Sequence, residues 1–315
     1  MELLREQWLW IISTPIYCII IGTEILLSHL QHRKLYTVKD TAGNIYLMLL
    51  NAGLDLGFRI VYLTVLAWFF SKSAIRWQTG VTYWLLLLLA EDFLYYWLHR
   101  FDHEIRFFWA THVTHHSSQK MNFSVGFRSS VFQPLYRFVY FIPLAYCGFS
   151  PADIAFMYSA TQIWGIFVHT ELIKKMGVLE YILVTPSHHR VHHASNARYL
   201  DKNMGMFLII WDKLFGTFQE ELTPAEYQPI QYGLTKNIDR PNAVNILFHE
   251  WKQIWLDIKR KDISFNEKWN YVFGPPGWSH DGSRLTSEQL REVESGTTVS
   301  VDFEQPILIS GSAKN

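Results

Sequence analysis

Histidine is unusually dense in the middle of this 315-residue chain. Ten of the 14 histidines lie between positions 99 and 193. They include a His-x-x-x-His pair, His99 and His103, and two His-x-x-His-His triplets at 112–116 and 189–193. On a helix these spacings turn imidazoles toward a shared direction, so we expect each triplet to aim three rings at one point.

Imidazole binds Zn, Cu, Fe and Ni, and one ion takes about four to six ligands. The pair and the triplets supply more rings than one ion uses, so the pattern predicts a two-metal site. A lone His-x-x-x-His pair is more often structural, but two accompanying triplets are hard to explain that way. The remaining isolated histidines are interpreted as structural. The predicted ligands are His99, His103, His112, His115, His116, His169, His189, His192, His193 and, last, His188.

Neutral imidazoles leave two divalent ions with about four positive charges to balance, so nearby acids are expected. The candidates are Asp92, Asp102, Glu104 and Glu171. Asp92 shares a helical stripe with His99 and His103, which predicts that it accepts a hydrogen bond from a ligating imidazole. The other three acids are equally well explained as surface residues.

The composition predicts an all-α, multi-pass integral membrane bundle. Hydrophobic residues make up 49% of the chain, and 28 basic residues balance 28 acidic ones, so no nucleic-acid partner is expected. Between Trp8 and Leu27 the only charge is Glu24, the pattern of a membrane span. This run is longer than a signal h-region, so we expect a retained anchor. Two cysteines, Cys18 and Cys147, exclude a thiolate cluster.

We expect one membrane-embedded domain over 1–290. It comprises spans at about 8–30, 44–70, 81–98, 131–149 and 152–172, a histidine-rich cap over 99–130 and 173–220, an amphipathic helix at 242–261 and a polar C-terminal tail over 291–315.

Counting five crossings places all three histidine groups on one face of the membrane. The first loop on that face carries Arg33, Lys34 and Lys39, against Lys72 and Arg76 across the membrane. The positive-inside rule therefore favours a site on the cytosolic face, of the endoplasmic reticulum membrane or a bacterial inner membrane. The amphipathic helix either lies in the membrane interface or covers the cap.

A metal pair beside a membrane suits redox work on an apolar substrate. Two irons with open positions bind dioxygen and abstract hydrogen from an unactivated C–H bond, while the protein holds the metals and admits the substrate. The sequence has neither a Gly-x-Gly-x-x-Gly fingerprint nor the His-Pro-Gly-Gly of a fused cytochrome b5. Electrons are therefore expected from an external donor, either a diffusible pterin or a redox protein.

The histidine pair and triplets resemble those of the fatty acid hydroxylase and sterol desaturase superfamily. Short sequence motifs over about 85–220 are similar to those of its alkylglycerol monooxygenase branch, and a weaker similarity occurs at 274–278. These motifs are Glu91-Asp-Phe-x-Tyr-Tyr-x-x-His-Arg100, His115-His-Ser-Ser118, Thr185-Pro-Ser-His-His-Arg-Val-His-His193, Asp201-Lys-Asn203, Trp211-Asp-Lys-x-Phe-Gly-Thr-Phe218 and Gly274-Pro-Pro-Gly-Trp278.

The resemblance implies a di-iron centre that hydroxylates a lipid carbon with O2, using tetrahydrobiopterin as the reductant. Hydroxylation beside an ether oxygen gives a hemiacetal that breaks down to an aldehyde and a glycerol derivative. It also implies that the pair and triplets are ligands, that His169 is an additional one, and that Glu104 tunes the site. Some members carry further C-terminal spans, so substrate entry is expected to differ between them.

Two alternatives stay open at this stage. One is a hydroxylase or desaturase of sterols, fatty acyl chains or carotenoids that receives electrons from a redox protein. The other is a membrane carrier of metal or haem. A transporter should place its ligands near the midplane of its spans, and a haem carrier isolated pairs on facing helices, whereas here the triplets flank the predicted spans.

Overall fold

The computed structural model describes residues 2–239 and 241–296. Within these residues the chain is helical and contains no β-strand. Among the described residues, the only sheet-like pairs are isolated bridges between Leu183 and Leu208 and between Ala194 and Tyr232. The predicted all-α class is therefore confirmed.

Three helices are long and apolar enough to cross a membrane: α1 (Glu2–Leu30), α2 (Val38–Lys72) and α3 (Val81–Glu104). They expose large apolar side chains such as Trp10, Leu49 and Ile60, which are suited to contact with lipid. Helix α2 has 35 residues and so rises about 52 Å, well beyond a hydrocarbon core of about 30 Å. Part of α2 must therefore extend past the bilayer.

The predicted span at 131–149 is not one continuous helix. A short 3-10 turn (η2, Gln133–Leu135) precedes α5 (Phe138–Tyr146), whose nine residues rise only about 14 Å. Pro134, within this turn, lacks the N–H group that a continuous helix would use, whereas Pro143 lies inside α5 without ending it. Helix α6 (Pro151–Phe167) ends earlier than predicted and rises about 26 Å.

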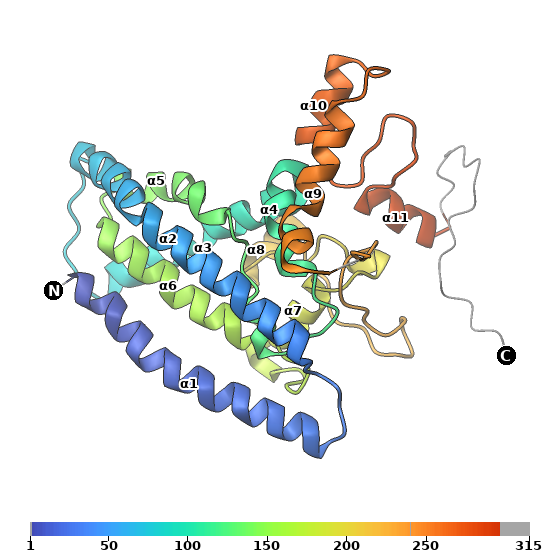
Figure 1. Ribbon diagram of the computed structural model, residues 1–315. Helices are drawn as coiled ribbons and strands as arrows, with labels where there is room; N and C mark the ends of the chain where they lie inside the picture. The colour runs from blue at the N-terminus through green and yellow to red at the C-terminus, as the bar shows by residue number, and fades with distance from the viewer. Residues whose placement is uncertain (1, 240, 297–315) are drawn as a thin grey trace.

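The helical bundle is built by packing these shorter helices onto the long ones. Helix α5 lies against α2 and α3, while α6 lies against α1 and α3 (Figure 1). The main apolar core forms where α2, α3, α5 and α6 meet, and it includes Leu66, Leu87, Phe141, Leu144 and Ile154. This core fixes how α3 projects its histidines and where α6 ends, two residues before His169.

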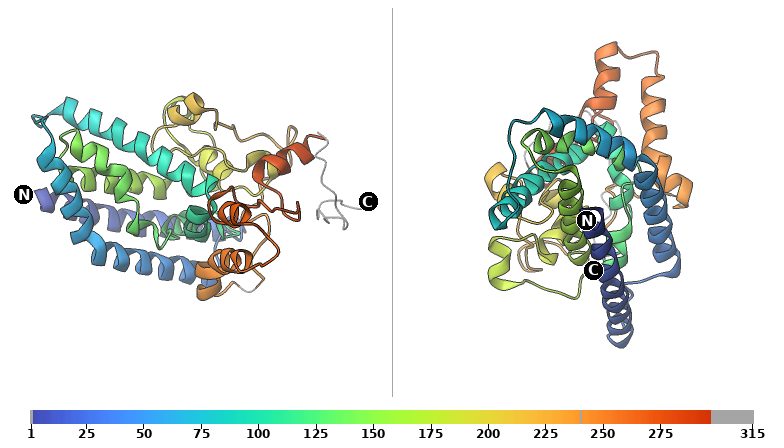
Figure 2. Two further views of the ribbon diagram at one scale, coloured as in Figure 1. Left: turned by 90° about the horizontal axis from the view of Figure 1, so that it is seen from above. Right: turned by 90° about the vertical axis from the view of Figure 1, so that its left-hand side faces the viewer.

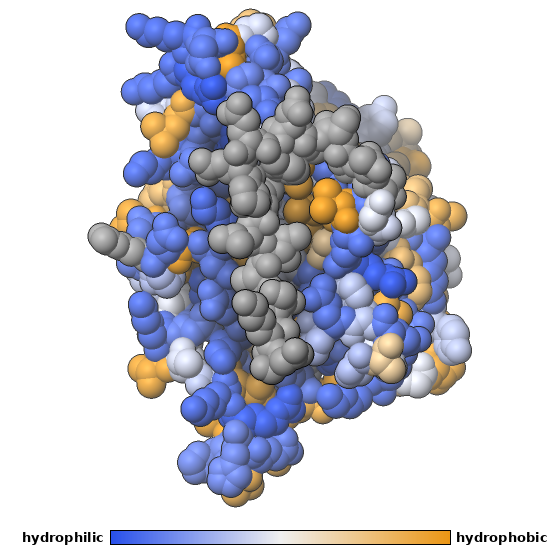
Figure 3. Space-filling model, turned by 90° about the vertical axis from the view of Figure 1, so that its right-hand side faces the viewer, coloured by the Kyte–Doolittle hydropathy of each residue, from blue (hydrophilic) through white to orange (hydrophobic). Residues whose placement is uncertain are grey.

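The remaining elements form a cap at one end of the bundle (Figure 2, left). Seen from that end, most of the described surface is hydrophilic (Figure 3). The cap elements are α4 (Arg106–His116), η1 (Phe123–Phe127), η3 (Gly177–Tyr181), α7 (Pro186–His192), η4 (Ala197–Tyr199), α8 (Ile210–Phe215), α9 (Ala243–Ile258), α10 (Phe265–Phe273) and α11 (Ser287–Glu294). The predicted polar tail at 291–315 thus begins inside α11, and residues 297–315 lie outside the described part of the chain.

Loops between the spans are tied to this cap. Arg33 pairs with Glu171 at 2.7 Å, and the Asn122 amide donates to the Leu35 carbonyl at 2.7 Å. The backbone N–H of Phe123 donates to the buried carboxylate of Glu24 at 2.8 Å. These contacts hold the end of α1 and the start of α2 against the segments that carry histidines.

Candidate metal centre

Nine of the ten predicted ligands gather into two clusters in the cap. The first, called the five-histidine cluster, contains His99, His103, His112, His116 and His192. The second, called the four-histidine cluster, contains His115, His169, His189 and His193. Within each cluster the potential ligand nitrogens all lie within 4.8 Å of one another. All nine side chains are buried except that of His115, which is partly exposed.

The expectation that each triplet serves one point is wrong, because both triplets are divided between the clusters. On α4, His112 and His116 face the five-histidine cluster and His115 faces the other. On α7 the assignment is reversed, since His192 alone joins the five-histidine cluster. The helical twist accounts for this. Residues four apart, such as His112 and His116, point in nearly the same direction, whereas the residue between them at i+3 points in a different direction, toward the other cluster.

The two clusters adjoin each other. The rings of His116 and His193, one from each cluster, are stacked with their centroids 4.4 Å apart. The rings of His115 and His116 are 5.3 Å apart. Two ions held here would therefore be close neighbours, as in a dinuclear centre.

Backbone carbonyls fix the orientation of four imidazoles. The Nδ1 atoms of His99, His115, His169 and His192 lie 2.6–3.0 Å from the carbonyl oxygens of Met204, Arg128, Gly165 and Lys202, in that order. A carbonyl only accepts, so each Nδ1 carries the proton and each Nε2 presents a lone pair to its cluster. This second hydrogen bond is the usual support of a metal-bound histidine.

The facing Nε2 atoms have the spacing of ligands that share one metal ion. His99 and His112 bring their Nε2 atoms to 3.0 Å, and His169 and His189 bring theirs to 2.9 Å. Two nitrogens about 2.0–2.1 Å from one ion at about a right angle would be about 3 Å apart. The Nε2 atoms of His103 and His192 are buried without a hydrogen-bond partner among the described residues. One cation in each cluster would be within reach of these nitrogens.

Burial keeps the cap imidazoles neutral, which is the form that binds metal. Desolvation lowers the pKa of His112, His116, His189, His192 and His193 well below the usual value, and neighbouring imidazoles lower each pKa further. Desolvation also lowers the pKa of His115 to about 4. No proton therefore has to leave these rings at neutral pH before a metal binds.

Asp92 contacts none of the histidines, so its predicted role is wrong. Its carboxylate accepts the backbone N–H groups of Phe207 and Leu208 and the indole N–H of Trp211, at 2.9–3.0 Å. It anchors the loop over 201–208 to α3. That loop supplies the carbonyls that orient His99 and His192, so Asp92 acts on the site only through the backbone.

Asp212 also anchors the backbone of this loop through hydrogen bonds. It accepts the backbone N–H groups of Met204 and Gly205 at 2.6 and 2.8 Å, and the hydroxyl of Thr217 at 2.6 Å. The loop needs this support, because Asp201 and Asn203 adopt positive φ angles of 53° and 55°. Asp and Asn tolerate this left-handed region better than most residues.

The acids nearest the histidines are Asp102 and Asp201. Asp201 accepts from His103 Nδ1 at 3.2 Å, and Asp102 Oδ2 lies 3.8 Å from His112 Nδ1. Glu104, predicted to tune the site, instead pairs with Arg100 at 2.7 Å on the surface. Asp201 was not among the predicted acids, since only the unusual backbone of its loop brings it to His103. Asp102 was among them, and its burial distinguishes it from Glu104.

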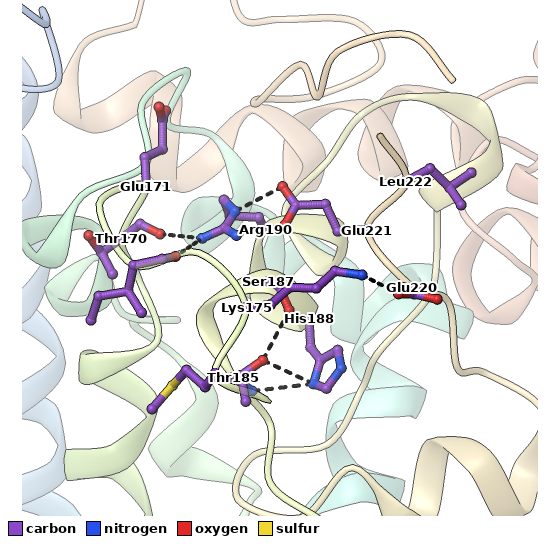
Figure 4. Close-up of polar contacts among 12 residues, drawn as sticks. Thr170, Glu171, Lys175, Thr185, Ser187, His188, Arg190, Glu220, Glu221 and Leu222 are labelled. Carbon is purple, nitrogen blue, oxygen red and sulfur yellow. Dashed lines mark hydrogen bonds and ion pairs between the residues drawn. The ribbon is translucent and has the colours of Figure 1, made fainter. Parts of the chain in front are cut away.

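His188 is the predicted ligand that joins neither cluster. Its ring caps the start of its own helix, with Nδ1 accepting the backbone N–H of Thr185 at 3.3 Å (Figure 4). The next turn of α7 is held by Arg190, whose guanidinium donates to Glu221 and to the Thr170 carbonyl (Figure 4). His188 therefore positions the second triplet without facing it.

A cavity of about 650 Å³ connects the histidines to the bundle. His99 and His112 of one cluster and His115, His169 and His189 of the other line its inner end. Its walls come mainly from α1, α2 and α6, and include Trp10, Leu49 and Ile163. Trp10 and Leu49 are also exposed on the outer surface of the bundle, so the cavity reaches the face suited to lipid.

The fold and the site together define a helical membrane protein with two adjoining histidine clusters. Residues 84–217 match the family model described as fatty acid hydroxylase. This segment is therefore similar to fatty acid hydroxylases, and the resemblance read from the histidine motifs is confirmed. The matched segment includes every histidine of both clusters and the loop that orients them.

Curated relatives extend the comparison. The chain is 35% identical to alkylglycerol monooxygenase from Homo sapiens over 89% of this chain and 62% of that protein. It is 37% identical to the Xenopus tropicalis protein of the same name, over 66% of this chain and 45% of the relative. It is also 30% identical to an ornithine lipid hydroxylase from Rhizobium tropici, over 48% of this chain and 45% of the relative.

The chain thus spans between about half and two thirds of the length of the alkylglycerol monooxygenases that it matches. No solved structure matches it significantly. The description of the metal centre therefore depends on the geometry given above.

Proposed function

We propose that this chain is a membrane di-iron oxygenase that hydroxylates a lipid C–H bond with O2. Each histidine cluster would hold one iron ion. The substrate we favour is an alkylglycerol, attacked at the carbon beside its ether oxygen, with tetrahydrobiopterin as the reductant. The names of the relatives that align over most of this chain support this choice.

The observation that carries the proposal is the opening of both clusters into one apolar cavity. Histidines of both clusters line that cavity, together with Ile163 and Ile166 of α6. On α1 the lining runs from Leu9 to Ile21, a rise of about 18 Å. This exceeds one leaflet of a bilayer core, which is about 15 Å thick, so an extended hydrocarbon chain fits along the helices.

Some residues of the chain would hold the metal ions, and others would admit the lipid substrate. The histidines supply neutral nitrogen ligands, and the loop over 201–208 keeps two of them aimed. The cavity excludes bulk water and orients the lipid chain so that one carbon lies nearest the histidines. A bound iron pair would supply the activation of dioxygen and the removal of hydrogen from that carbon.

The overall change balances as an oxygenation. One atom of O2 enters the C–H bond and forms a hydroxyl group. The other leaves as water, taking electrons and protons from the donor. For an ether lipid the product is a hemiacetal, whose C–O bond then breaks to release an aldehyde and a free glycerol hydroxyl. Tetrahydrobiopterin is the donor that the relationship to alkylglycerol monooxygenases favours.

We place the active site on the cytosolic face of the endoplasmic reticulum membrane or a bacterial inner membrane. The basic residues Arg33, Lys34 and Lys39 lie at the same end of the bundle as the cap and support this orientation. A pterin or a redox protein would reach the cap from that side.

Product analysis on a defined alkylglycerol tests the proposal. The purified protein, loaded with iron, is expected to release the fatty aldehyde only when O2 and tetrahydrobiopterin are both present. Turnover of a sterol, fatty acyl chain or carotenoid with a redox protein instead would support that alternative and overturn the ether-lipid assignment. A Soret band in the purified protein, with no lipid oxidation, would support a haem carrier.

A further inference from the structure

Helices α9 and α10 form a pair that projects sideways from the cap. In Figure 1 this pair stands across the direction in which α1, α2 and α3 run. The end-on view in Figure 2 also shows it extending beyond the bundle. If the three long helices cross a membrane, α9 and α10 must lie roughly parallel to its surface. We call the two helices and their connection the α9–α10 hairpin.

The hairpin is fastened to the cap by one polar face. Arg106 of α4 is 2% exposed and donates to Glu250 and Asp257 of α9 at 2.7 and 2.6 Å. It also donates to the Tyr271 carbonyl of α10 at 3.1 Å. The hairpin is therefore held in a fixed orientation, and its outer face has a definite direction.

That outer face is apolar and aromatic. On α9, Val244, Phe248 and Trp255 recur at helical spacing and are exposed, Trp255 by 55%. On α10, Phe265 and Trp269 are 76% and 56% exposed. A face of this kind covering two helices is uncommon on a protein surface that contacts only water. Tryptophan in particular is enriched where a protein meets the membrane interface.

The start of α9 lies at the level where α2 leaves the bundle. Ile246 and Leu247 pack against Leu47 of α2 and Val131 in a buried cluster. The ring of Phe248 lies 5.9 Å from that of Phe132. Because α2 is longer than a bilayer core is thick, its first turns belong to the interface or beyond. The start of α9 is thus packed against a candidate span.

The charge of the hairpin favours an anionic surface. The negative charges of the acids of α9 are compensated, since Glu250 and Asp257 both form ion pairs with Arg106. The exposed lysines Lys252 and Lys259 lie beside the aromatic stripe, and Lys259 Nζ lies 4.6 Å from the ring centroid of Trp255. Lysines flanking an interfacial helix are attracted to anionic lipid headgroups.

We propose that the α9–α10 hairpin is a lipid-binding surface that lies in the headgroup region of an anionic membrane. Its aromatic face enters the boundary between headgroups and acyl chains, and its lysines bind lipid phosphates. The hairpin thereby sets how deep the cap sits in the interface. This inference depends on membrane insertion of the bundle and is independent of the reaction at the histidines.

Spin labels in lipid nanodiscs test this depth. Cys18 and Cys147 are replaced by alanine, and a nitroxide is attached through Trp255→Cys or Trp269→Cys in the full chain. We expect both labels to be more accessible to dissolved O2 than to a water-soluble nickel chelate. Gln253→Cys is the matched control, because Gln253 is exposed on the same helix away from the stripe, and its label should show the reverse.

Varying the charge of the lipids tests whether the lysines bind lipid phosphates. Raising the fraction of phosphatidylglycerol in phosphatidylcholine nanodiscs should move the labels at 255 and 269 deeper, and Lys252→Gln with Lys259→Gln should remove most of that shift. Labels as accessible to nickel as the control, or spin–spin broadening from a second copy of the chain, would overturn the inference. Iron content and lipid oxidation are not readouts, so failure of the proposed reaction would leave this result intact.

Discussion

His99 Nδ1 lies 2.7 Å from the carbonyl oxygen of Met204, a residue 105 positions further along the chain. The imidazole donates this hydrogen bond, so Nε2 faces its cluster with a free lone pair. The backbone N–H of Met204 is held in turn by Asp212 at 2.6 Å. The orientation of the predicted ligand His99 thus depends on the carboxylate of Asp212, which does not contact it directly.

Asp212→Asn should weaken metal binding through this chain of contacts. The amide replaces one accepting oxygen by a donor, so Met204 or Gly205 loses its partner and the loop over 201–208 shifts. Loss of such outer support typically costs about 10-fold to 100-fold in metal affinity. Iron titration of the apo protein measures the change. Glu226→Gln is the control, since Glu226 is exposed and bonds only to Thr223, and equal affinity in both variants would contradict the argument.

His115→Ala and His192→Ala each remove one ligand, from different clusters. Both variants should lose lipid oxidation and bind less metal, while membrane insertion is unchanged. His188→Ala should keep its metal, because it removes only a helix cap worth about 0.5–2 kcal/mol of stability. Metal content and membrane fractionation distinguish these outcomes. Full activity in either of the first two variants would refute the ligand assignment.

Asp201 and Glu104 are expected to differ sharply when neutralised. Asp201→Asn weakens the hydrogen bond that orients His103, so the five-histidine cluster should bind iron less tightly. Glu104→Gln removes only a surface ion pair with Arg100, worth at most about 1 kcal/mol, and should leave metal content unchanged. Iron content at limiting free metal gives the comparison. A larger loss in the Glu104 variant would show that the acid acts on the site by a route absent from this geometry.

Removing metal should destabilise the folded protein. Without a cation, the buried Nε2 atoms of His169 and His189 lie 2.9 Å apart, and the Nδ1 atom of His189 has no hydrogen-bond partner among the described residues. A ligand that binds only the native state adds stability, by about 2.7 kcal/mol at a free concentration 100 times its Kd. We expect a chelator to lower the midpoint of thermal unfolding in detergent, and ferrous iron to restore it. The His115→Ala variant should respond less, and an unchanged midpoint in the parent protein would count against structural metal binding.

Asp55→Asn should destabilise the bundle without touching the cap. Asp55 pairs with Arg137 and lies 3.3 Å from Arg59, so the substitution removes a carboxylate that two guanidinium groups contact. Breaking a fully buried pair on one side costs about 3–5 kcal/mol, and this partly buried pair, which lines the cavity, should cost less. Replacing Arg137 by Gln in the same chain should recover part of this loss. Unfolding measured for both variants tests the pair, and equal stability of the single variant and the parent would contradict it.

The sequence predicts which residues form the site better than it predicts how they are arranged in space. Histidine density and spacing identify all nine clustered residues, because periodicity on α4 and α7 is a local property. The division of each triplet between two clusters is not local, since it depends on how those helices face each other. The same limit explains Asp92, whose partners Phe207 and Leu208 lie more than 100 positions away.

The fold was predictable to a similar degree. Three long apolar helices follow from hydropathy, but the interruption before α5 does not, because the apolar content of 131–149 is that of a continuous span despite Pro134. Asp201 escaped prediction because its contact with His103 requires a positive φ angle, and no periodic pattern in the sequence signals that conformation.

The division of both triplets between the clusters also bears on the order in which the protein can mature. Each cluster draws rings from α4 and from α7, and the carbonyls of Lys202 and Met204, which orient His192 and His99, follow later in the chain. A chain emerging from the ribosome therefore lacks part of this arrangement until synthesis has passed residue 204. Iron bound as proposed would thereby be loaded late in biosynthesis, when most of the bundle has already been made.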